Sequence, residues 1–355
     1  MSDQNGNMKT IELHENGLDI QFRILENGVV ELADLSSQEV KKAAMEPKED
    51  IYYPAVEIHR SGTGSLNMHA YKNNINQSSV DFVYEKHELK EQDGGKELEI
   101  VMVSPEKLKA VYHMRLFDGV PAVQTWTEIT NEGSEDQGLT YVSSFIYQGI
   151  SRGGDKPYYK KTDIYVPFNS WCCEAQWQKY DAETLNLNGM VVDGFNHQGY
   201  GLNRYCYSGK GTWSTCEYLP MGIAEDRETG ETYIFQVESS GQWLIEYGSA
   251  QGGNLYLTIS GATEQEHGWY KNLKPGECFT TVPAGAAVVK GGLNPAVAAL
   301  TRYRRKVRRA NPDDEKLNVV FNDYMNCLMG DPTTERELSI IDKAAELGCE
   351  YYCLD

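Results

Sequence analysis

The chain has 355 residues, of which 40% are hydrophobic and 24% are charged, and its formal net charge at pH 7 is −19. An acidic surface of this kind repels phosphate backbones and anionic lipids, so we expect no nucleic-acid partner and no membrane partner. No apolar stretch is long enough to span a bilayer, and the opening residues lack the apolar segment of a signal peptide, so we expect a cytoplasmic protein.

The cysteines and histidines show no pattern typical of a metal site. The eight cysteines include no doubled C-x-x-C spacing, and the seven histidines are dispersed without an H-E-x-x-H motif. We expect reduced thiols that serve as packing residues. The pair Gly153-Gly154 lacks the flanking strand and helix that a phosphate loop requires. We therefore expect no metal, no nucleotide and no other cofactor.

Residues 1–292 carry the pattern of an antiparallel β-protein. Leu18–Ile24 alternates apolar and polar residues, and Glu26-Asn27-Gly28 then turns the chain into Val29–Leu32, which predicts a hairpin. Further strands are predicted at Leu98–Val103, Lys109–Leu116, Val123–Ile129, Tyr233–Val237, Trp243–Tyr247 and Leu255–Ile259. So many short strands without intervening helices predict a mostly β fold with a large sandwich.

A helix is predicted from Pro295 to Ala310, within a linker that we place at residues 293–312. Six of the eight residues in Arg302–Arg309 are basic. Cations late in a helix suit its dipole, and we interpret them as a face that meets the acidic body of the protein.

Residues 313–355 read as strand, loop, helix and strand. Leu317–Phe321 is a short apolar run typical of a buried strand, and Cys349–Leu354 is a second one. Between them a helix is predicted to begin with Asp331 as N-cap and Pro332 behind it, or a turn later with a capping box at Thr334. Gly348 is placed to end the helix. This order predicts a βαβ unit and a parallel sheet.

In parallel sheets the functional groups lie beyond the carboxyl ends of the strands. Polar residues occupy both such places here: the loop Asn322–Asp331, which is long for its type, and Asp355. Asn and Asp are also common loop residues, so the pattern by itself leaves a purely structural role open.

These residues resemble the opening of the catalytic barrel of glycoside hydrolase family 36, the α-galactosidases and α-N-acetylgalactosaminidases. The family reads N-S/T-W-E-A after its first barrel strand and L-D-D-G-W after its second. The corresponding residues here are Asn322, Asp323, Tyr324, Met325 and Asn326, followed by Leu354 and Asp355. Tyr324 stands where the family has a Trp that packs on the sugar, and Asp323 and Asn326 also depart from the pattern. Which substituents the sugar carries therefore stays open.

The resemblance extends to residues 1–292, which are similar to the family's galactose-mutarotase-like β-supersandwich. The matching phrases are Leu116–Pro121, Lys274–Glu277 and Gly291–Asn294. Residues 313–355 would then be the start of a (β/α)8 barrel, of which about 250 residues are usual.

The resemblance implies a retaining hydrolase that acts on terminal α-linked galactose of oligosaccharides or glycoconjugates, by a double displacement between two carboxylates. Both catalytic Asp residues of the family lie on later barrel strands, so this chain would contain no catalytic residue and would be inactive alone. Asp355 would bind sugar hydroxyls at C4 or C6, Tyr324 would form an aromatic wall, and Asp323 and Asn326 would add polar contacts. Loops of the family's sandwich reach a neighbouring subunit, which implies a homo-oligomer.

Three other interpretations stay open. One is an α-N-acetylgalactosaminidase, since an Asn loop could make room for an N-acetyl group. Another is a non-catalytic carbohydrate-binding sandwich, for which the stretches Asn169–Trp177 and His267–Tyr270 offer aromatic and amide side chains. A mutarotase-like epimerase would need a His–Glu pair in the sandwich cleft, and the sequence does not make such a pair evident.

Overall fold

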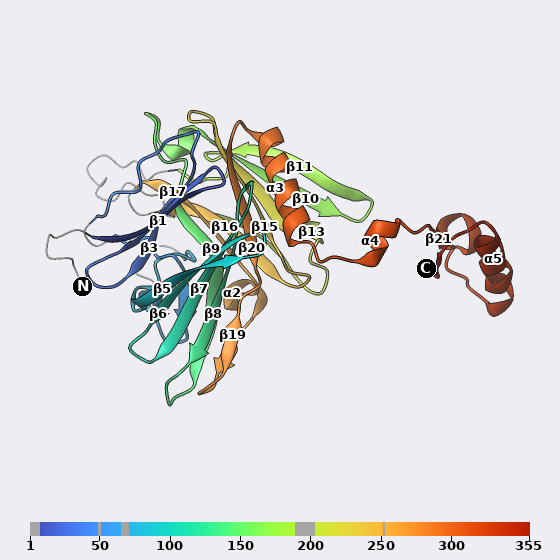
Figure 1. Ribbon diagram of the computed structural model, residues 1–355, viewed down its shortest axis with the longest axis horizontal. Coiled ribbons are helices and arrows are strands. Elements are labelled where there is room, and N and C mark those ends of the chain that lie inside the picture. Colours follow the sequence, from blue (N-terminus) through green and yellow to red (C-terminus); the bar gives the residue numbers. More distant parts are fainter. Residues whose placement is uncertain (1–7, 49–50, 65–70, 189–202, 251–252) are drawn as a thin grey trace. The chain divides into compact units, whose positions relative to one another are not determined.

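The computed structural model describes residues 8–48, 51–64, 71–188, 203–250 and 253–355, apart from the side chain of Asn326. The chain forms two compact units, Met1–Lys306 and Val307–Asp355 (Figure 1). Each unit is described by itself.

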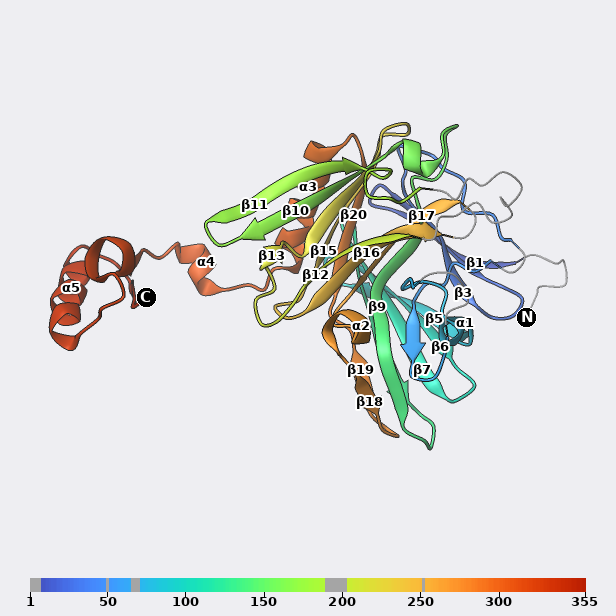
Figure 2. The same cartoon turned by 180° about the vertical axis from the view of Figure 1, so that it is seen from behind.

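The first unit consists of antiparallel sheets (Figures 1 and 2). A three-stranded sheet contains β1 (Lys9–Glu15), β2 (Leu18–Ile24) and β3 (Val30–Ser37). A six-stranded sheet has the order β12-β16-β17-β9-β18, with β4 paired to β9. Its strands are β4 (Ile58–Arg60), β9 (Gln137–Ile150), β12 (Arg204–Gly209), β16 (Trp243–Ala250), β17 (Asn254–Ser260) and β18 (Lys271–Leu273).

The largest sheet has 11 strands in the order β11-β10-β14-β15-β20-β8-β7-β6-β5, with β13 paired to β10 and β19 to β8. Its strands are β5 (Val83–Gln92), β6 (Gly95–Val103), β7 (Leu108–Phe117), β8 (Val120–Asn131), β10 (Thr162–Ser170), β11 (Cys173–Asp181), β13 (Glu217–Tyr218), β14 (Met221–Asp226), β15 (Glu231–Val237), β19 (Cys278–Thr280) and β20 (Ala284–Lys290). Short helical turns connect some strands: α1 (Gln77–Val80), η1 (Tyr158–Lys160) and α2 (Glu264–His267).

The two larger sheets pack face to face around aromatic side chains. Tyr147 of β9 and Tyr233 of β15 have ring centroids 6.0 Å apart, and Phe235 of β15 lies 6.0 Å from Tyr247 of β16. Every residue of β15 and β16 is buried, as expected for central strands covered on both faces, whereas β8 alternates between buried and half-buried residues. The predictions of a mostly β fold, of a large antiparallel sandwich and of the Leu18–Leu32 hairpin are confirmed.

The predicted helix is observed as α3 (Leu293–Val307), which packs on the large sheet. Tyr303 is fully buried there, and its ring makes an edge contact with Phe117 of β7 at 5.4 Å. A side chain at Gly285 of β20 would place its Cβ 2.5 Å from the Tyr303 ring. Glycine at this position therefore lets α3 pack closely against the strand. Arg304 Nε donates to the amide oxygen of Gln236 at 2.6 Å. Within the described part of the first unit, Arg304 thus meets the sandwich through an amide, and no ion pair joins Arg302, Arg304, Arg305 or Lys306 to a sandwich carboxylate.

The second unit is the predicted βαβ unit. It contains α4 (Pro312–Lys316), β21 (Val320–Asn322), the π-helical turn η2 (Tyr324–Leu328), α5 (Thr334–Glu346) and β22 (Tyr351–Cys353). β21 and β22 pair in parallel. Both predicted starts of α5 were wrong, because Thr333 is the N-cap and its hydroxyl accepts from the Arg336 N–H. Gly348 follows the helix with φ +86°, as predicted.

The expectation that the cysteines are packing residues was largely wrong. All eight are free thiols, and five of them are exposed: Cys172, Cys173, Cys216, Cys278 and Cys327. They lie at a hairpin end, at the start of strand β19, in a loop and in the π-helical turn η2, where apolar sequence neighbours do not ensure burial. In the described part of the chain, we find no helix whose length and hydropathy would let it cross a membrane.

Candidate functional site

The carboxyl ends of β21 and β22 lie side by side in the second unit. The register pairs Val320 with Tyr351 and Asn322 with Cys353. Parallel pairing therefore brings residues 322–324 next to the segment that leaves β22, as the βαβ prediction required. The groups that meet here are Asn322, Asp323, Tyr324 and Asp355.

Asn322 connects the two strand ends. Its Nδ2 donates to Asp355 Oδ2 at 2.9 Å, while its Oδ1 accepts from the Tyr324 N–H at 2.9 Å. An amide can serve both sides because it carries a donor and an acceptor. Asn322 was not among the predicted site residues, although it stands first in the motif that suggested the site.

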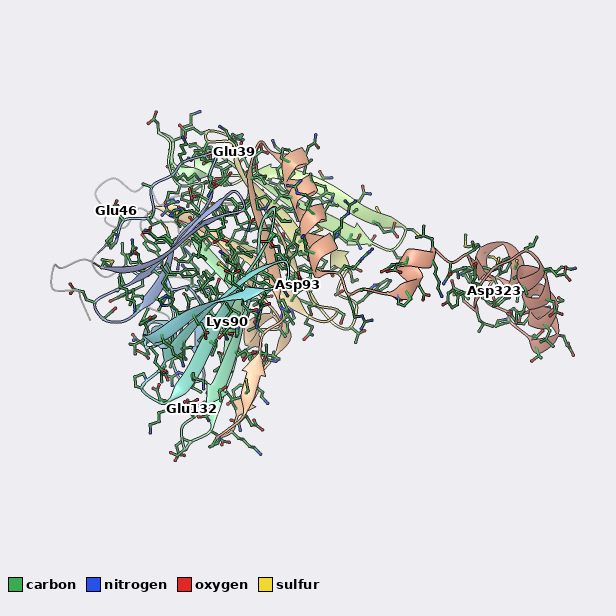
Figure 3. The ribbon with its side chains drawn as sticks, viewed as in Figure 1. Glu39, Glu46, Lys90, Asp93, Glu132 and Asp323 are labelled. Atoms are coloured by element: carbon green, nitrogen blue, oxygen red, sulfur yellow. The ribbon has the colours of Figure 1, made fainter. Side chains whose placement is uncertain are left out.

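Asp323 is buried at 1% exposure beneath this corner. Its Oδ1 accepts from the Asp355 N–H at 3.0 Å, and its Oδ2 lies 3.3 Å from the Tyr352 hydroxyl. That hydroxyl also contacts Glu337 of α5, and desolvation together with the two carboxylates raises the pKa of Tyr352. Asp323, labelled in Figure 3, thus holds the backbone of Asp355 in place.

Tyr324 begins the π-helical turn, and the residue is 36% exposed. The turn is closed by the Leu328 and Met329 N–H groups, which donate to the carbonyls of Asp323 and Tyr324 at 2.9 and 2.8 Å. Asn326 lies in this turn, and its side chain is outside the described part of the structure.

The arrangement suits binding and orientation of a polar ligand. Asp355 is exposed, Asn322 fixes one of its carboxylate oxygens, and no described residue donates to the other. A carboxylate positioned in this way accepts strong, directional hydrogen bonds from hydroxyl groups. Tyr324, whose backbone N–H donates to Asn322, is an exposed residue with an aromatic ring of the kind that carbohydrate sites use.

In the sandwich, the stretch Asn169–Trp177 forms the end of the β10–β11 hairpin (Figure 2). Trp171 is 80% exposed at its tip, where Cys172 has a left-handed φ of 60°. Asn169 supports the tip, because its Oδ1 accepts from the Ala175 N–H at 2.9 Å. Trp177 faces α3 instead and lines a cavity of about 370 Å³ with Leu293 and other residues.

The second aromatic stretch, His267–Tyr270, is divided between core and surface. Trp269 packs against Phe279 at 5.2 Å, whereas Tyr270 is 53% exposed. His267 Nδ1 accepts from the Thr263 N–H at 3.0 Å, and its Nε2 lies 3.2 Å from the Gly209 carbonyl. Burial lowers the pKa of His267, which makes it a neutral, structural histidine.

Glu97, Glu99 and His113 are grouped closely enough to hold a metal ion. They lie on β6 and β7, in the part of the sheet that Lys90 of β5 borders (Figure 3). Lys90 Nζ is 2.5 Å from Glu99 Oε1, and His113 Nδ1 is 2.9 Å from Glu97 Oε1. The lysine already supplies the cation that these carboxylates need, so we interpret the group as an ion-pair network.

The structure also shows a His–Glu pair that the sequence did not make evident. His59 Nε2 lies 3.6 Å from Glu57 Oε2, and both side chains are buried at 8% and 0% exposure. Glu57 accepts from the Asn76 N–H at 3.2 Å and the Ser79 hydroxyl at 2.6 Å. The Glu57 carboxylate is thus buried, and its oxygens accept hydrogen bonds from the segment around Asn76 and Ser79, which it holds in place. This arrangement gives no support to an epimerase site.

No protein-family model and no curated protein matches the chain. Solved structures do match. The chain resembles a GH36 α-galactosidase, AgaA from Geobacillus stearothermophilus in complex with raffinose, with a TM-score of 0.70 and 16% identity over 98% of this chain and 50% of that one. It resembles the galactosidase domain of the α-galactosidase–sucrose kinase AgaSK with a TM-score of 0.73 and 15% identity, over 99% and 50%.

An α-galactosidase from Lactobacillus brevis gives a TM-score of 0.67 at 15% identity, over 97% of this chain and 48% of that one. The chain therefore has the fold of one half of GH36 α-galactosidases, and it spans about half the length of the structures that it matches. At this identity the likeness establishes the fold.

Proposed function

We propose that the chain is the amino-terminal part of a retaining exo-α-galactosidase of glycoside hydrolase family 36, which removes terminal α-linked galactose from oligosaccharides or glycoconjugates. The observation that carries the proposal is the hydrogen-bonded pair Asn322–Asp355 at the ends of two parallel strands. The pair occurs in a chain that matches solved GH36 α-galactosidase structures over nearly all of its own residues and over about half of theirs.

In this proposal Asp355 orients the sugar and does no bond chemistry. Its free carboxylate oxygen accepts a hydrogen bond from a galactose hydroxyl, at C4 or C6, while Asn322 fixes the other oxygen. Tyr324 forms an aromatic wall beside the ring. Asp323, being buried, acts as a positioning residue through the Asp355 N–H.

The nucleophile and the acid/base carboxylate would come from barrel strands beyond residue 355. In a retaining enzyme, one carboxylate attacks the anomeric carbon, and the second protonates the leaving oxygen and then deprotonates water. Apolar side chains of the second unit support such a continuation: Leu338 is 58% exposed, Leu347 80% and Val320 55%. Neighbouring strands and helices of a (β/α)8 barrel would cover such residues.

We propose that the enzyme assembles as a homo-oligomer.

α-N-acetylgalactosaminidase activity is the alternative within the same family, since Tyr324 replaces a larger Trp. A non-catalytic carbohydrate-binding module is the alternative from another class. Trp171 and Trp213, which are 80% and 60% exposed in the sandwich, favour it, because exposed indole rings stack on sugar faces.

The test compares hydrolysis of an aryl α-galactoside and an aryl α-N-acetylgalactosaminide by the uninterrupted native gene product. Loss of one hydrogen bond to a charged acceptor is worth ~1.5–3 kcal/mol, so we expect Asp355→Asn to lower kcat/KM by about 10- to 150-fold. Asp342→Asn removes a carboxylate from the exposed face of α5 and should leave kcat/KM unchanged. A folded protein that hydrolyses neither substrate would refute the proposal in favour of the module.

A further inference from the structure

A cavity of about 370 Å³ lies in the first unit between α3 and the strands β10, β11, β14 and β15. Figure 1 shows α3 beside β10 and β11. The volume is that of a site for a small molecule, and such sites are mostly apolar with a few polar groups that orient the ligand. The lining of this cavity has that composition.

The register of the strands makes the sheet side of the cavity apolar. Tyr165 of β10 pairs with Ile223 of β14, which pairs with Ile234 of β15, so their side chains stand in one row on the same face of the sheet. Trp177 of β11 and Met221 of β14 lie in the next row of that face. Four of these five residues line the cavity, and Ile223 is fully buried.

The other side of the cavity is one face of α3. Leu293, Val297 and Leu300 recur at spacings of four and three residues, which places them on one side of the helix. Arg304 follows four residues later on the same side. Leu293 and Val297 remain 42% and 45% exposed. Apolar area that a ligand removes from water here contributes to its binding.

Arg304 is the one charged residue among the described residues that line the cavity. Its Nε donates to Gln236 at 2.6 Å, and its two terminal nitrogens donate to no described residue. The nearby carboxylate of Glu238 is occupied, because it accepts from Gln124 at 2.6 Å and Gln236 at 3.1 Å and contacts the Tyr303 hydroxyl. The guanidinium group is therefore held in place without being neutralised.

The basic stretch that the sequence analysis singled out strengthens the charge at this end of the cavity. Arg302, Arg305 and Lys306 lie beside Arg304 on α3, and in the described part of the first unit none of them pairs with a carboxylate. Such a concentration of unpaired cations attracts an anionic group.

The opposite end of the cavity carries a carboxylate. Glu225 lies beside Gly292, where an added Cβ would be 3.0 Å from its Oε1. Arg304 is eleven residues beyond Leu293, or ~17 Å along the helix axis. An anionic group of a ligand therefore belongs at the Arg304 end.

We propose that this cavity binds a small apolar molecule that carries one carboxylate. The apolar body lies between Trp177, Leu293 and Val297, and the carboxylate accepts from the terminal nitrogens of Arg304, whose planar group suits a carboxylate. A sugar fits less well, because the hydroxyls of Tyr165 and Thr301 already donate to Glu225 and to the Val297 carbonyl. The proposal does not depend on the hydrolase activity proposed above.

The experiment is isothermal titration calorimetry of the 355-residue chain with octanoate and, separately, with 1-octanol, which has the same apolar body without the charge. We expect octanoate to bind at one site and 1-octanol to bind about tenfold more weakly or less. No binding of octanoate, or equal affinity for the two probes, would overturn the proposal.

Two variants locate the site. Arg304→Gln should weaken octanoate binding by about tenfold or more and leave 1-octanol binding unchanged. Arg305→Gln is the matched control, because it removes the adjacent exposed cation, which does not line the cavity, and should bind octanoate like the parent. Equal octanoate affinities for these two variants would overturn the role of Arg304.

Val297→Asp places a carboxylate in the cavity at a partly exposed position, so it should fold and lose binding of both probes. Unchanged octanoate binding by Val297→Asp would show that the ligand lies elsewhere. Sedimentation tests the other occupant, a second copy of the chain. If the parent binds no octanoate and forms an oligomer that Val297→Asp dissociates, the face is a subunit interface and the proposal is wrong.

Discussion

The attachment of α3 to the sandwich depends on Tyr303, and this dependence can be measured. Tyr303 is 0% exposed, its ring lies 5.4 Å from Phe117, and its hydroxyl contacts Glu238. Truncating a buried aromatic residue costs ~3–5 kcal/mol. With a urea slope of about 3 kcal/mol/M, Tyr303→Ala should lower the unfolding midpoint by about 1–1.7 M.

Tryptophan fluorescence is a suitable probe, because all six Trp residues lie before residue 307 and report on the first unit. Tyr303→Phe is the matched control. It keeps the ring and loses only the hydroxyl, and Glu238 retains Gln124 at 2.6 Å and Gln236 at 3.1 Å as donors. We expect Tyr303→Phe to lower the free energy of unfolding by about 1 kcal/mol.

A double-mutant cycle sharpens the test. Gly285→Ala places a Cβ 2.5 Å from the Tyr303 ring and should cost ~1–3 kcal/mol by overpacking. In the Tyr303→Ala background that space is vacant, so Gly285→Ala should then cost little. Strictly additive losses, or an unchanged midpoint in Tyr303→Ala, would refute this account of how α3 is held.

Three further predictions concern charge, protonation and capping. Arg204→Met removes the partner that lies 2.6 Å from the fully buried Glu246, so we expect a loss of ~3–5 kcal/mol in urea unfolding. The pKa of His267 is lowered in the folded protein, so between that pKa and 6.5 the unfolded chain binds a proton that the folded protein does not. The free energy of unfolding should therefore fall as the pH drops from 6.5 to the folded pKa. An NMR titration of His267 should give a midpoint below 6.5. Thr333→Ala should cost α5 about 1 kcal/mol and speed exchange of the Arg336 amide.

Each of these has its own control. Lys210→Met removes an exposed cation near the same cluster and should leave the midpoint almost unchanged. A His267 midpoint at or above 6.5 would contradict the lowered pKa of this half-buried histidine. Thr334→Ala alters the residue that the sequence offered as an alternative cap. If it affects the Arg336 amide as much as Thr333→Ala does, the observed cap is wrong.

The local features of the fold could be predicted from the sequence. The Leu18–Leu32 hairpin follows from alternation and from Gly28, whose φ of +88° is natural for glycine. The parallel pairing of β21 and β22 followed from the order strand, helix, strand. The N-cap of α5 could not be predicted from the sequence, because Asp331, Thr333 and Thr334 are all suitable by residue type and only the backbone conformation decides among them.

Features that join distant parts of the chain could not be predicted. Glu246 accepts hydrogen bonds from Asn73, Arg204 and Tyr256, and no local pattern marks a buried carboxylate with donors from separate strands. At the candidate site, the pairing of strand ends placed Asp355 correctly near residue 322. The burial of Asp323 depends on Tyr352 and on helix α5, so sequence alone could not separate it from the exposed residues beside it.

We propose that these residues belong to an α-glycosidase whose catalytic carboxylates lie beyond residue 355. The most direct measurement compares hydrolysis of an aryl α-galactoside by the 355-residue chain and by the uninterrupted native gene product, at equal concentrations and with folding checked by circular dichroism. We predict hydrolysis by the longer protein and none by the shorter chain. Hydrolysis by the 355-residue chain, or none by a folded longer protein, would contradict the account.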